Sequence, residues 1–417
     1  MTNIENKITR KVAIFHCGFI YSGGGERIVL EEAIGLKKKE YEVVVYAPTL
    51  DNKKCFPHMV RELDVRTFIS HRTRFLPGGY ALNLVLSSLL APFFAYNFRD
   101  VDIFVGANQP SAWIAFCIAK ILRKPYIVYL NQPNRVVYPR PVDLEYGWAT
   151  TVKDYHRLFK LFHKALRPVI SWLDKSSIQH ADNLLVNGKY IGDIIENIYA
   201  KKTVDAPAGA YAYPLSLLTT SPQVYKGSIN IAGQKINKPY ALITNRHDPQ
   251  KRFDYVIEAL AIVLKTYKNA KLVIPGPFTD HTKNLKILAK KLGIEDKVIF
   301  LGQIKEDDLK KLYRHTSVYC YPSPEEDFGL GPLEAGGWGV PTVAWNHGGP
   351  TVTVDNGVTG LLAKPYDIKN YAKHMLTLFN DPRLRARMGK AAWKRTKNEF
   401  SWEKHIDTIE SVINELI

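Results

Sequence analysis

Two basic residues, Arg246 and Lys251, lie five positions apart in the stretch NRHDPQKRFD, directly after the apolar run YALIT. A guanidinium and an ammonium that approach from one loop can together neutralise an anion with several charges, such as a pyrophosphate. A basic loop taken by itself is more often simply solvated. The pair is therefore a candidate anion site whose meaning depends on the loops around it.

Two acidic residues, Glu326 and Glu334, lie eight positions apart around the turn FGLGP. Pro332 suits the first turn of a helix, so Glu334 is expected inside that helix and Glu326 before it. Backbone N–H groups of the turn would face an anion, and Glu334 could accept hydrogen bonds from ribose hydroxyls. The alternative for Glu334 is a carboxylate that only favours the helix dipole.

A third loop, SGGGER, contains the consecutive glycines Gly23 to Gly25 ahead of a helical pattern. Without side chains, its N–H groups could approach an anionic or sugar ligand closely. The spacing is not G-x-G-x-x-G, which disfavours a nicotinamide-dependent dehydrogenase. A simple tight turn remains the alternative.

Apolar segments rich in β-branched and aromatic residues alternate with segments of helical period. The expected strands lie in RKVAIFHCGF, YEVVVYAP, DIFVGA and PYIVYLN, and later in PYALITN, AKLVIPG, KVIFLG, SVYCYPS and VPTVAWN. Such a pattern predicts an α/β fold with parallel sheets covered on both faces. Ligands bind beyond the carboxyl ends of such strands, where the three loops fall.

The alternation restarts after residue 238, which predicts two doubly wound domains. The polar, glycine-containing stretch 226–239 is the expected linker. The domains are therefore placed at 1–225 and 226–399. The amphipathic segment 400–417 is expected to pack back on the first domain.

Taken together, TNRHDPQKRFD, the EEDFGLGPLEA segment, GVTGLLAKPYD and SGGGERIVLEEA resemble the family-4 retaining glycosyltransferases of the GT-B fold, although Val352 in GGPTVTVDNG stands where relatives often have a glutamate. The resemblance covers nearly the whole chain and is nearest to mannosyltransferase-like enzymes of lipid-linked glycan or polysaccharide synthesis. It implies two Rossmann-like domains facing a central cleft, an acceptor side at 1–225 and a nucleotide-sugar side at 226–399.

The resemblance also implies roles for individual residues. Arg246 and Lys251 would hold the diphosphate of the nucleotide sugar and stabilise the leaving group, and Glu326 would lie beside the transferred sugar. The other implied nucleotide-sugar contacts are Gly23, Gly24, Phe328, Gly329, Leu330 and Glu334. At Asn131 relatives commonly have a histidine, so this position is expected near the acceptor or sugar without proton transfer.

The activity implied is transfer of a hexose, mannose or similar, from a GDP- or UDP-sugar to a glycan or lipid-linked hydroxyl. No cofactor and no metal ion are expected. Asp100 and Asp102 form a D-x-D pattern, but they precede a strand and are expected to cap it. A nucleotide-sugar epimerase or a phosphorylase of the same architecture is the alternative.

The chain has 417 residues, 57 Lys and Arg against 40 Asp and Glu, and a formal net charge of +17. This surplus suits a polyanionic partner. No nucleic-acid-binding module is recognisable, so an anionic membrane surface is the favoured partner, contacted through the basic amphipathic segment 152–175. For 152–175, an ordinary helix that packs on the first domain is an equally open interpretation. The apolar segment 81–98 is expected to be a core helix rather than a membrane contact.

Four separated cysteines and the lack of a signal-peptide pattern indicate reduced thiols and a cytoplasmic protein, with peripheral association at the inner face of the cell membrane left open.

Overall fold

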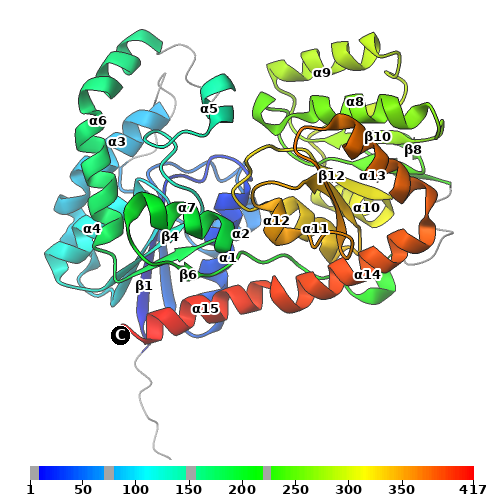
Figure 1. Cartoon of the computed structure of the whole chain (residues 1–417). Coiled ribbons are helices and arrows are strands. Elements are labelled where there is room, and N and C mark those ends of the chain that lie inside the picture. The colour runs from blue at the N-terminus through cyan, green and yellow to red at the C-terminus, as the bar shows by residue number, and fades with distance from the viewer. Residues whose placement is uncertain (1–8, 70–78, 147–155, 219–226) are drawn as a thin grey trace, which may run out of the picture. The chain divides into compact units, whose positions relative to one another are not determined.

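The computed structural model describes residues 9–69, 79–146, 156–218 and 227–417, apart from the side chains of 81 and 156–166. The chain forms two compact units (Figure 1). Unit 1 comprises Met1–Pro139, Trp148–Ala208 and Trp402–Ile417, and unit 2 comprises Arg140–Gly147 and Gly209–Ser401. Unit 2 therefore resumes at Gly209 rather than at 226. It also includes a short segment, 140–147, from the middle of the first domain that the sequence suggested.

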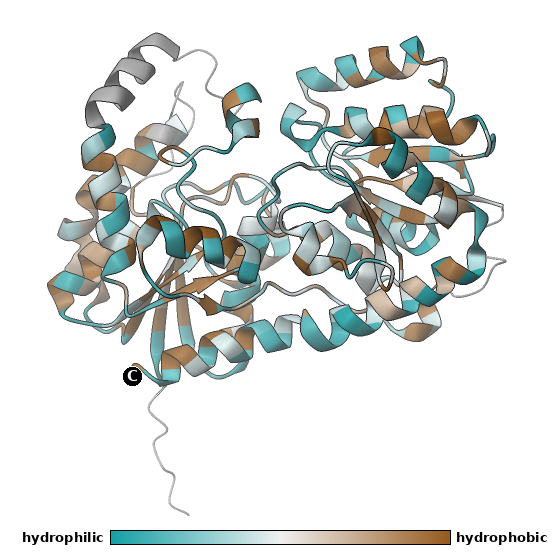
Figure 2. Ribbon diagram, in the orientation of Figure 1, coloured by the Kyte–Doolittle hydropathy of each residue, from teal (hydrophilic) through white to brown (hydrophobic). Residues whose placement is uncertain are grey.

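Unit 1 is built on a six-stranded parallel sheet with the order β2-β1-β3-β4-β5-β6. Its strands are β1 (Lys11–His16), β2 (Glu42–Tyr46), β3 (Ile103–Ala107), β4 (Tyr126–Leu130), β5 (Asn183–Val186) and β6 (Val204–Asp205). The first four were predicted and are confirmed. Strands β3 and β4 are buried at every position, because helices cover both faces of the sheet, and Figure 2 shows mostly hydrophobic residues in these strands.

Helices surround this sheet on both faces. They are α1 (Gly24–Lys38), α2 (Pro57–Glu62), α3 (Gly79–Phe94), α4 (Ser111–Leu122), α6 (His156–Gln179), α7 (Lys189–Tyr199) and α15 (Trp402–Asn414), with a 3-10 turn η2 (Ala95–Phe98) after α3. Right-handed crossovers place α1 on one face and α3, α4, α6 and α7 on the other. None of the described helices combines the length and apolarity needed to cross a membrane.

The C-terminal helix α15 packs on α1 in unit 1. Buried Glu32 lies with Oε1 3.2 Å from Nε2 of His405, which is buried as well. At the other end of the contact, Lys39 pairs with Asp407 at 2.7 Å and with Glu410 at 2.5 Å. Helix α15 is thus held to α1 by one buried polar contact and one cluster of ion pairs.

The D-x-D pattern has a structural place at the amino ends of β1 and β3. The backbone N–H of Lys11 donates to Oδ2 of Asp102 at 2.7 Å, and the Lys11 ammonium pairs with Asp100 at 2.7 Å. Asp102 thus caps the start of a strand, as the sequence suggested, whereas Asp100 forms a surface ion pair.

Unit 2 contains a second six-stranded parallel sheet, ordered β11-β10-β9-β12-β13-β14. Its strands are β9 (Tyr240–Leu242), β10 (Lys271–Pro275), β11 (Val298–Gly302), β12 (Val318–Tyr321), β13 (Thr342–Trp345) and β14 (Gly360–Ala363). The five strands predicted for this half are confirmed, and β14 was not predicted. The chain runs outward from β9 through β10 to β11 and then returns to the other side of β9 at β12.

The helices of unit 2 fill both sides of its sheet with apolar residues. They are α5 (Pro141–Tyr146), α8 (Phe253–Leu264), α9 (Asp280–Lys291), α10 (Glu306–His315), α11 (Leu330–Gly337), α12 (Pro350–Thr353), α13 (Ile368–Asn380) and α14 (Pro382–Glu399), with 3-10 turns η4 (Leu215–Leu217) and η6 (Pro249–Lys251).

The prediction that 226–239 is a linker is wrong. Residues 228–237 form an antiparallel hairpin of β7 (Ser228–Ile231) and β8 (Gln234–Asn237). Its turn places Ala232 and Gly233 at positive φ, as a tight hairpin requires. Ile231 and Ile236 are fully buried in the same apolar cluster as β9, so the segment belongs to unit 2.

Candidate active site

The loops after β9 and β12 leave neighbouring strands at the carboxyl edge of the second sheet. The strand order reverses between these two strands, and loops at such a switch point diverge and leave a crevice in which ligands bind. Arg246 and Lys251 lie in the first loop, and Glu326 and Phe328 lie in the second. The structure therefore brings the basic pair and the acidic motif to one edge of unit 2.

The basic loop is anchored by a buried histidine between its two cations. His247 is fully buried, and its carbonyl oxygen accepts a hydrogen bond from Oγ1 of Thr279 at 2.5 Å. Arg246 remains about half exposed, with Nη2 3.3 Å from Oδ2 of Asp248. The loop thus holds a guanidinium at the edge of the sheet where a ligand can reach it.

Lys251, at the end of η6, contacts the acidic motif directly. Its Nζ lies 2.9 Å from Oε2 of Glu326. Burial by itself raises the pKa of Glu326, but the charges of Lys251 and Arg140 and hydrogen bonds from Lys251 and Tyr321 outweigh it and lower the pKa to about 2. At neutral pH Glu326 is therefore a carboxylate that accepts hydrogen bonds, and it is not a proton donor.

Glu326 makes the free energy of unfolding depend on acid pH. Its folded pKa of about 2 lies below the ordinary 4.5, so between these values the unfolded chain binds more protons. We expect the stability from this carboxylate to be complete above about pH 4.5 and to be lost as the pH falls toward 2. Urea titrations from pH 6 to pH 3 measure the slope. Glu326→Gln should flatten it and exposed Glu295→Gln should not; equal slopes for all three proteins would contradict the expectation.

The acidic motif leads into helix α11 through a left-handed residue. Gly329 has φ of 93°, a conformation that favours glycine, and α11 begins at the next residue, Leu330. Phe328 is buried and its ring lies 6.2 Å from that of Phe400. The first N–H groups of a helix have no partner within it, so this turn presents anion-binding groups beside Lys251.

Glu334 lies beyond the first turn of α11 and accepts a hydrogen bond from the phenol of Tyr313 at 3.0 Å. Tyr313 is also 2.8 Å from Oγ1 of Thr244, which follows β9. Burial raises the pKa of Tyr313 well above its usual value, so the phenol stays protonated as a donor. The carboxylate is oriented by a buried network rather than placed to favour a helix dipole, which acts chiefly at the first turn.

Arg140 is a site residue that the sequence did not reveal. Its Nη1 donates to the carbonyl oxygen of Glu325 at 3.0 Å and lies 3.6 Å from Oδ2 of Asp327. Asp143 holds the same guanidinium at 2.9 Å. Arg140, the residue before α5, thus contacts the residues on both sides of Glu326 although it is 185 residues from Glu325 in the sequence, and no local motif predicts this contact.

Replacing Arg140 by methionine should lower kcat/KM about tenfold, because a charged contact of about 1.5–3 kcal/mol positions Glu326 and holds down its pKa. We expect the acid limb of the pH–rate profile to move to higher pH, and Arg140→Lys to restore part of the loss. Thermal unfolding of each variant is the control. A profile that keeps its shape while activity falls with Tm would show that Arg140 is only structural.

In unit 1, Gly23 is the N-cap residue of α1 and Gly24 is its first residue. A Cβ on Gly23 would lie 2.4 Å from Oε2 of Glu26, so a larger residue would have to displace that carboxylate. Asn131 follows β4, and neither polar atom of its buried amide has a hydrogen-bond partner among the described residues. A Cβ at Gly25 would lie 3.7 Å from the Asn131 amide nitrogen. The glycine loop and Asn131 are thus neighbours in unit 1.

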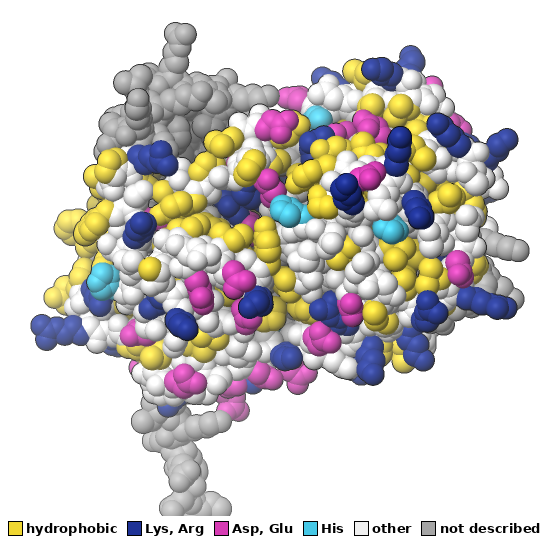
Figure 3. Space-filling model, in the orientation of Figure 1, with side chains coloured by type: hydrophobic (Ala, Val, Ile, Leu, Met, Phe, Trp, Pro, Cys, Tyr) yellow, Lys and Arg dark blue, Asp and Glu magenta, His cyan; other side chains and the backbone are white. Residues whose placement is uncertain are grey.

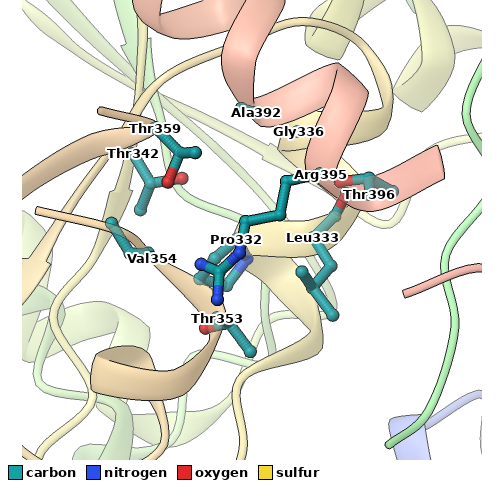
Figure 4. A pocket seen from close by; sticks show the side chains of 10 residues that line it. All are labelled: Pro332, Leu333, Gly336, Thr342, Thr353, Val354, Thr359, Ala392, Arg395 and Thr396. Atoms are coloured by element: carbon teal, nitrogen blue, oxygen red, sulfur yellow. Dashed lines mark hydrogen bonds between the residues drawn. The ribbon is translucent and has the colours of Figure 1, made fainter. Parts of the chain in front are cut away.

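A small pocket between α11, α12 and α14 does not have Glu334 among its lining residues (Figure 4). Pro332, Leu333 and Gly336 line it, and Figure 4 shows Arg395 of α14 reaching across it toward Thr353. Nη2 of Arg395 donates to the carbonyl oxygen of Val352 at 2.8 Å, which ties α12 to α14. Among the described residues no three His, Cys, Asp or Glu side chains are grouped as a metal site requires.

The segment 152–175, expected at a membrane surface, falls largely outside the described residues. Residues 152–155 are not described, and of 156–166 only the helical backbone of α6 is.

With this geometry in place, comparison with known proteins assigns the family. Residues 22–204 match the model for Glycosyltransferase Family 4, and residues 228–395 match that for Glycosyl transferases group 1. The chain is 25% identical to the alpha-1,3/1,6-mannosyltransferase ALG2 of Dictyostelium discoideum over 99% of this chain and 100% of that protein. It is 25% identical to human ALG2 over 95% and 94%.

A solved structure with the same fold is that of Anabaena HepE in complex with UDP and glucose. It has a TM-score of 0.72 and 19% identity, covering 98% of this chain and 100% of that one. The chain therefore belongs to the family-4 glycosyltransferases of the GT-B fold.

Proposed function

We propose that the protein transfers a hexose, with mannose preferred, from a nucleotide sugar to a hydroxyl group of a glycan or lipid-linked acceptor, with retention of configuration and without a metal ion. The observation that carries this is the Lys251–Glu326 pair beside the first turn of α11 at the switch point. Cations and helix N–H groups at one edge suit a diphosphate. Similarity to ALG2, a mannosyltransferase by name, supports mannose, and the UDP complex of HepE supports a nucleoside diphosphate.

The reaction breaks the bond between the anomeric carbon and the diphosphate oxygen and forms a bond to the acceptor oxygen. The electron pair leaves with the nucleoside diphosphate, and the acceptor's proton passes to the departing phosphate. Negative charge therefore grows on the diphosphate, where Arg246 and Lys251 stabilise the transition state more than the ground state. Attack from the same face as the departing group retains configuration and requires no enzyme nucleophile.

The remaining residues fit parts of the same substrate. Glu326 is ionised at neutral pH and accepts hydrogen bonds from hydroxyls of the transferred sugar. Glu334, oriented by Tyr313, accepts hydrogen bonds from the ribose. In unit 1, Gly23, Gly24 and Asn131 offer N–H groups and an amide to the sugar and acceptor.

Thermal-shift measurements with GDP, UDP and ADP identify the nucleotide, because a ligand of the native state stabilises in proportion to its affinity. The matching nucleotide mannose is then incubated with lipid-linked and free glycan acceptors. We expect free nucleoside diphosphate, a lengthened acceptor with the anomeric configuration of the nucleotide sugar by NMR, and an unchanged rate in EDTA. An isomerised sugar without transfer would contradict the proposal.

A further inference from the structure

Helix α3 buries its small and polar residues and exposes its large apolar ones. Its core-facing positions and the following turn are fully buried at Asn83, Ser87, Ala91 and Ala95, which repeat every four residues. The opposite face carries a row of large apolar side chains spaced by three or four. This row, the α3 stripe, consists of Leu82, Val85, Leu89, Phe93 and Tyr96.

The α3 stripe is open to solvent in the structure of the chain alone. Leu89 is 64% exposed, Phe93 80% and Tyr96 74%. A helix at a water-facing surface has the reverse pattern, with its large apolar side chains on the core. The prediction of a core helix at 81–98 is therefore wrong for half of its surface, and the exposed half is suited to an apolar environment.

The neighbouring helices extend the same surface. Helix α4 packs between α3 and α6. It exposes Ile121, and α6 exposes Val169 and Trp172, the last 63% exposed with its ring 6.4 Å from that of Trp113. Figure 3 shows hydrophobic side chains along the left edge of the face it draws, where α3 and α4 lie in Figure 1. Trp and Tyr are the residues that favour the boundary between lipid headgroups and acyl chains.

The exposed charged side chains around this surface are mostly basic. Helix α3 contains no charged residue, and the exposed basic residues near it on η2, α4 and the described part of α6 are Arg99, Lys120, Arg123, Arg167 and Lys175. Two exposed acidic residues lie beside these elements: Asp100 is paired with Lys11, and Asp182, after α6, accepts a hydrogen bond from the backbone N–H of Tyr126. An apolar row with a basic rim is complementary to a bilayer that carries anionic headgroups.

We propose that α3 lies in the plane of an anionic phospholipid membrane, with the α3 stripe in the acyl boundary and the basic rim at the headgroups. A second copy of the chain is a poorer occupant, because a two-fold contact through this face would place the basic rim against itself. The surface is carried by unit 1 alone and is independent of the sugar or nucleotide that the enzyme uses.

Flotation of the full chain with vesicles tests this. One set contains phosphatidylcholine with about one anionic phosphatidylglycerol in three lipids, and the other contains phosphatidylcholine alone. We expect binding to the anionic vesicles that weakens in high salt. The double variant Leu89→Ser, Phe93→Ser should bind them at least about tenfold more weakly. The control is Ile287→Ser on α9, because Ile287 is 64% exposed like Leu89 but lies in unit 2; it should bind as the wild type does.

Other outcomes would overturn the assignment. Wild-type protein that does not float, or a double variant that floats equally well, would show that the stripe does not contact lipid. Light scattering that finds a wild-type dimer and a monomeric double variant, with no difference in flotation, would assign the stripe to self-association. A third variant, Lys120→Gln with Arg123→Gln, should lower binding to anionic vesicles while leaving Tm unchanged. Unchanged binding would show that the basic rim does not contribute to membrane binding.

Discussion

Lys251→Met lowers kcat by about 100- to 1000-fold if this ammonium stabilises the leaving diphosphate, the usual loss when a preorganised group at a developing anion is removed. The substitution also leaves Glu326 without its partner at 2.9 Å, so the pKa of that carboxyl should rise. We therefore expect the kcat loss to be accompanied by a shift of the acid limb of the pH–rate profile to higher pH. Steady-state kinetics on a nucleotide sugar and a hydroxyl acceptor measure both.

The matched control for Lys251→Met is Lys268→Met, which removes an exposed lysine in the turn after α8. It should leave kcat and KM unchanged. A Lys251 variant with a raised KM but an undiminished kcat would indicate that the lysine binds substrate and transition state equally, which contradicts a role at the leaving group.

Gly349→Ala should displace the loop that carries the acidic motif. A Cβ at this position would lie 2.3 Å from both the Cα and the carbonyl oxygen of Phe328, and neither backbone atom can rotate away. The N–H of Gly349 also donates to the carbonyl oxygen of Glu326 at 2.6 Å. Relief of the clash must displace the loop that carries Glu326, so we expect a loss of about 3 kcal/mol, the upper end for overpacking, and a Tm lower by roughly 6–12 °C.

Thermal unfolding and kinetics together test the Gly349 prediction, and activity measured well below Tm should still fall by at least about tenfold because the carboxylate is displaced. Gly293→Ala is the control: its φ is +68° but nothing lies within 4 Å of the added Cβ. It should cost only about 1–2 kcal/mol and leave kcat intact. Equal behaviour of the two variants would show that the contact with Phe328 is unimportant.

Much of the fold and of the site can be predicted from local patterns in the sequence. Strand β9 and the strand β12 beside it are short apolar runs, and the residues that follow each must meet at one edge of a parallel sheet. That reasoning predicts that Lys251 and Glu326 lie at the same edge of the sheet. For Gly329 the resemblance implied a contact with the nucleotide sugar, whereas its left-handed conformation ahead of α11 is a finding of the structure.

Three features were missed or predicted wrongly from the sequence. Each depends on tertiary contacts that local composition and periodicity do not show. Arg140 reaches Glu325 across 185 residues, and no periodicity links them. The hairpin at 228–237 looks like a polar linker because only Ile231 and Ile236 face the core. In α3, apolar residues occur all round the helix, so composition could not show that Ala91 and Ser87 face inward while Leu89 faces solvent.

The most direct test of the account is a crystal structure with the nucleoside diphosphate that gives the largest thermal shift. Arg246 and Lys251 should contact the phosphate oxygens at about 2.7–2.9 Å, with the ribose hydroxyls on Glu334 and the phosphates at the first turn of α11. A nucleotide bound with its phosphates away from both cations, or bound at another edge of the sheet, would contradict the central claim.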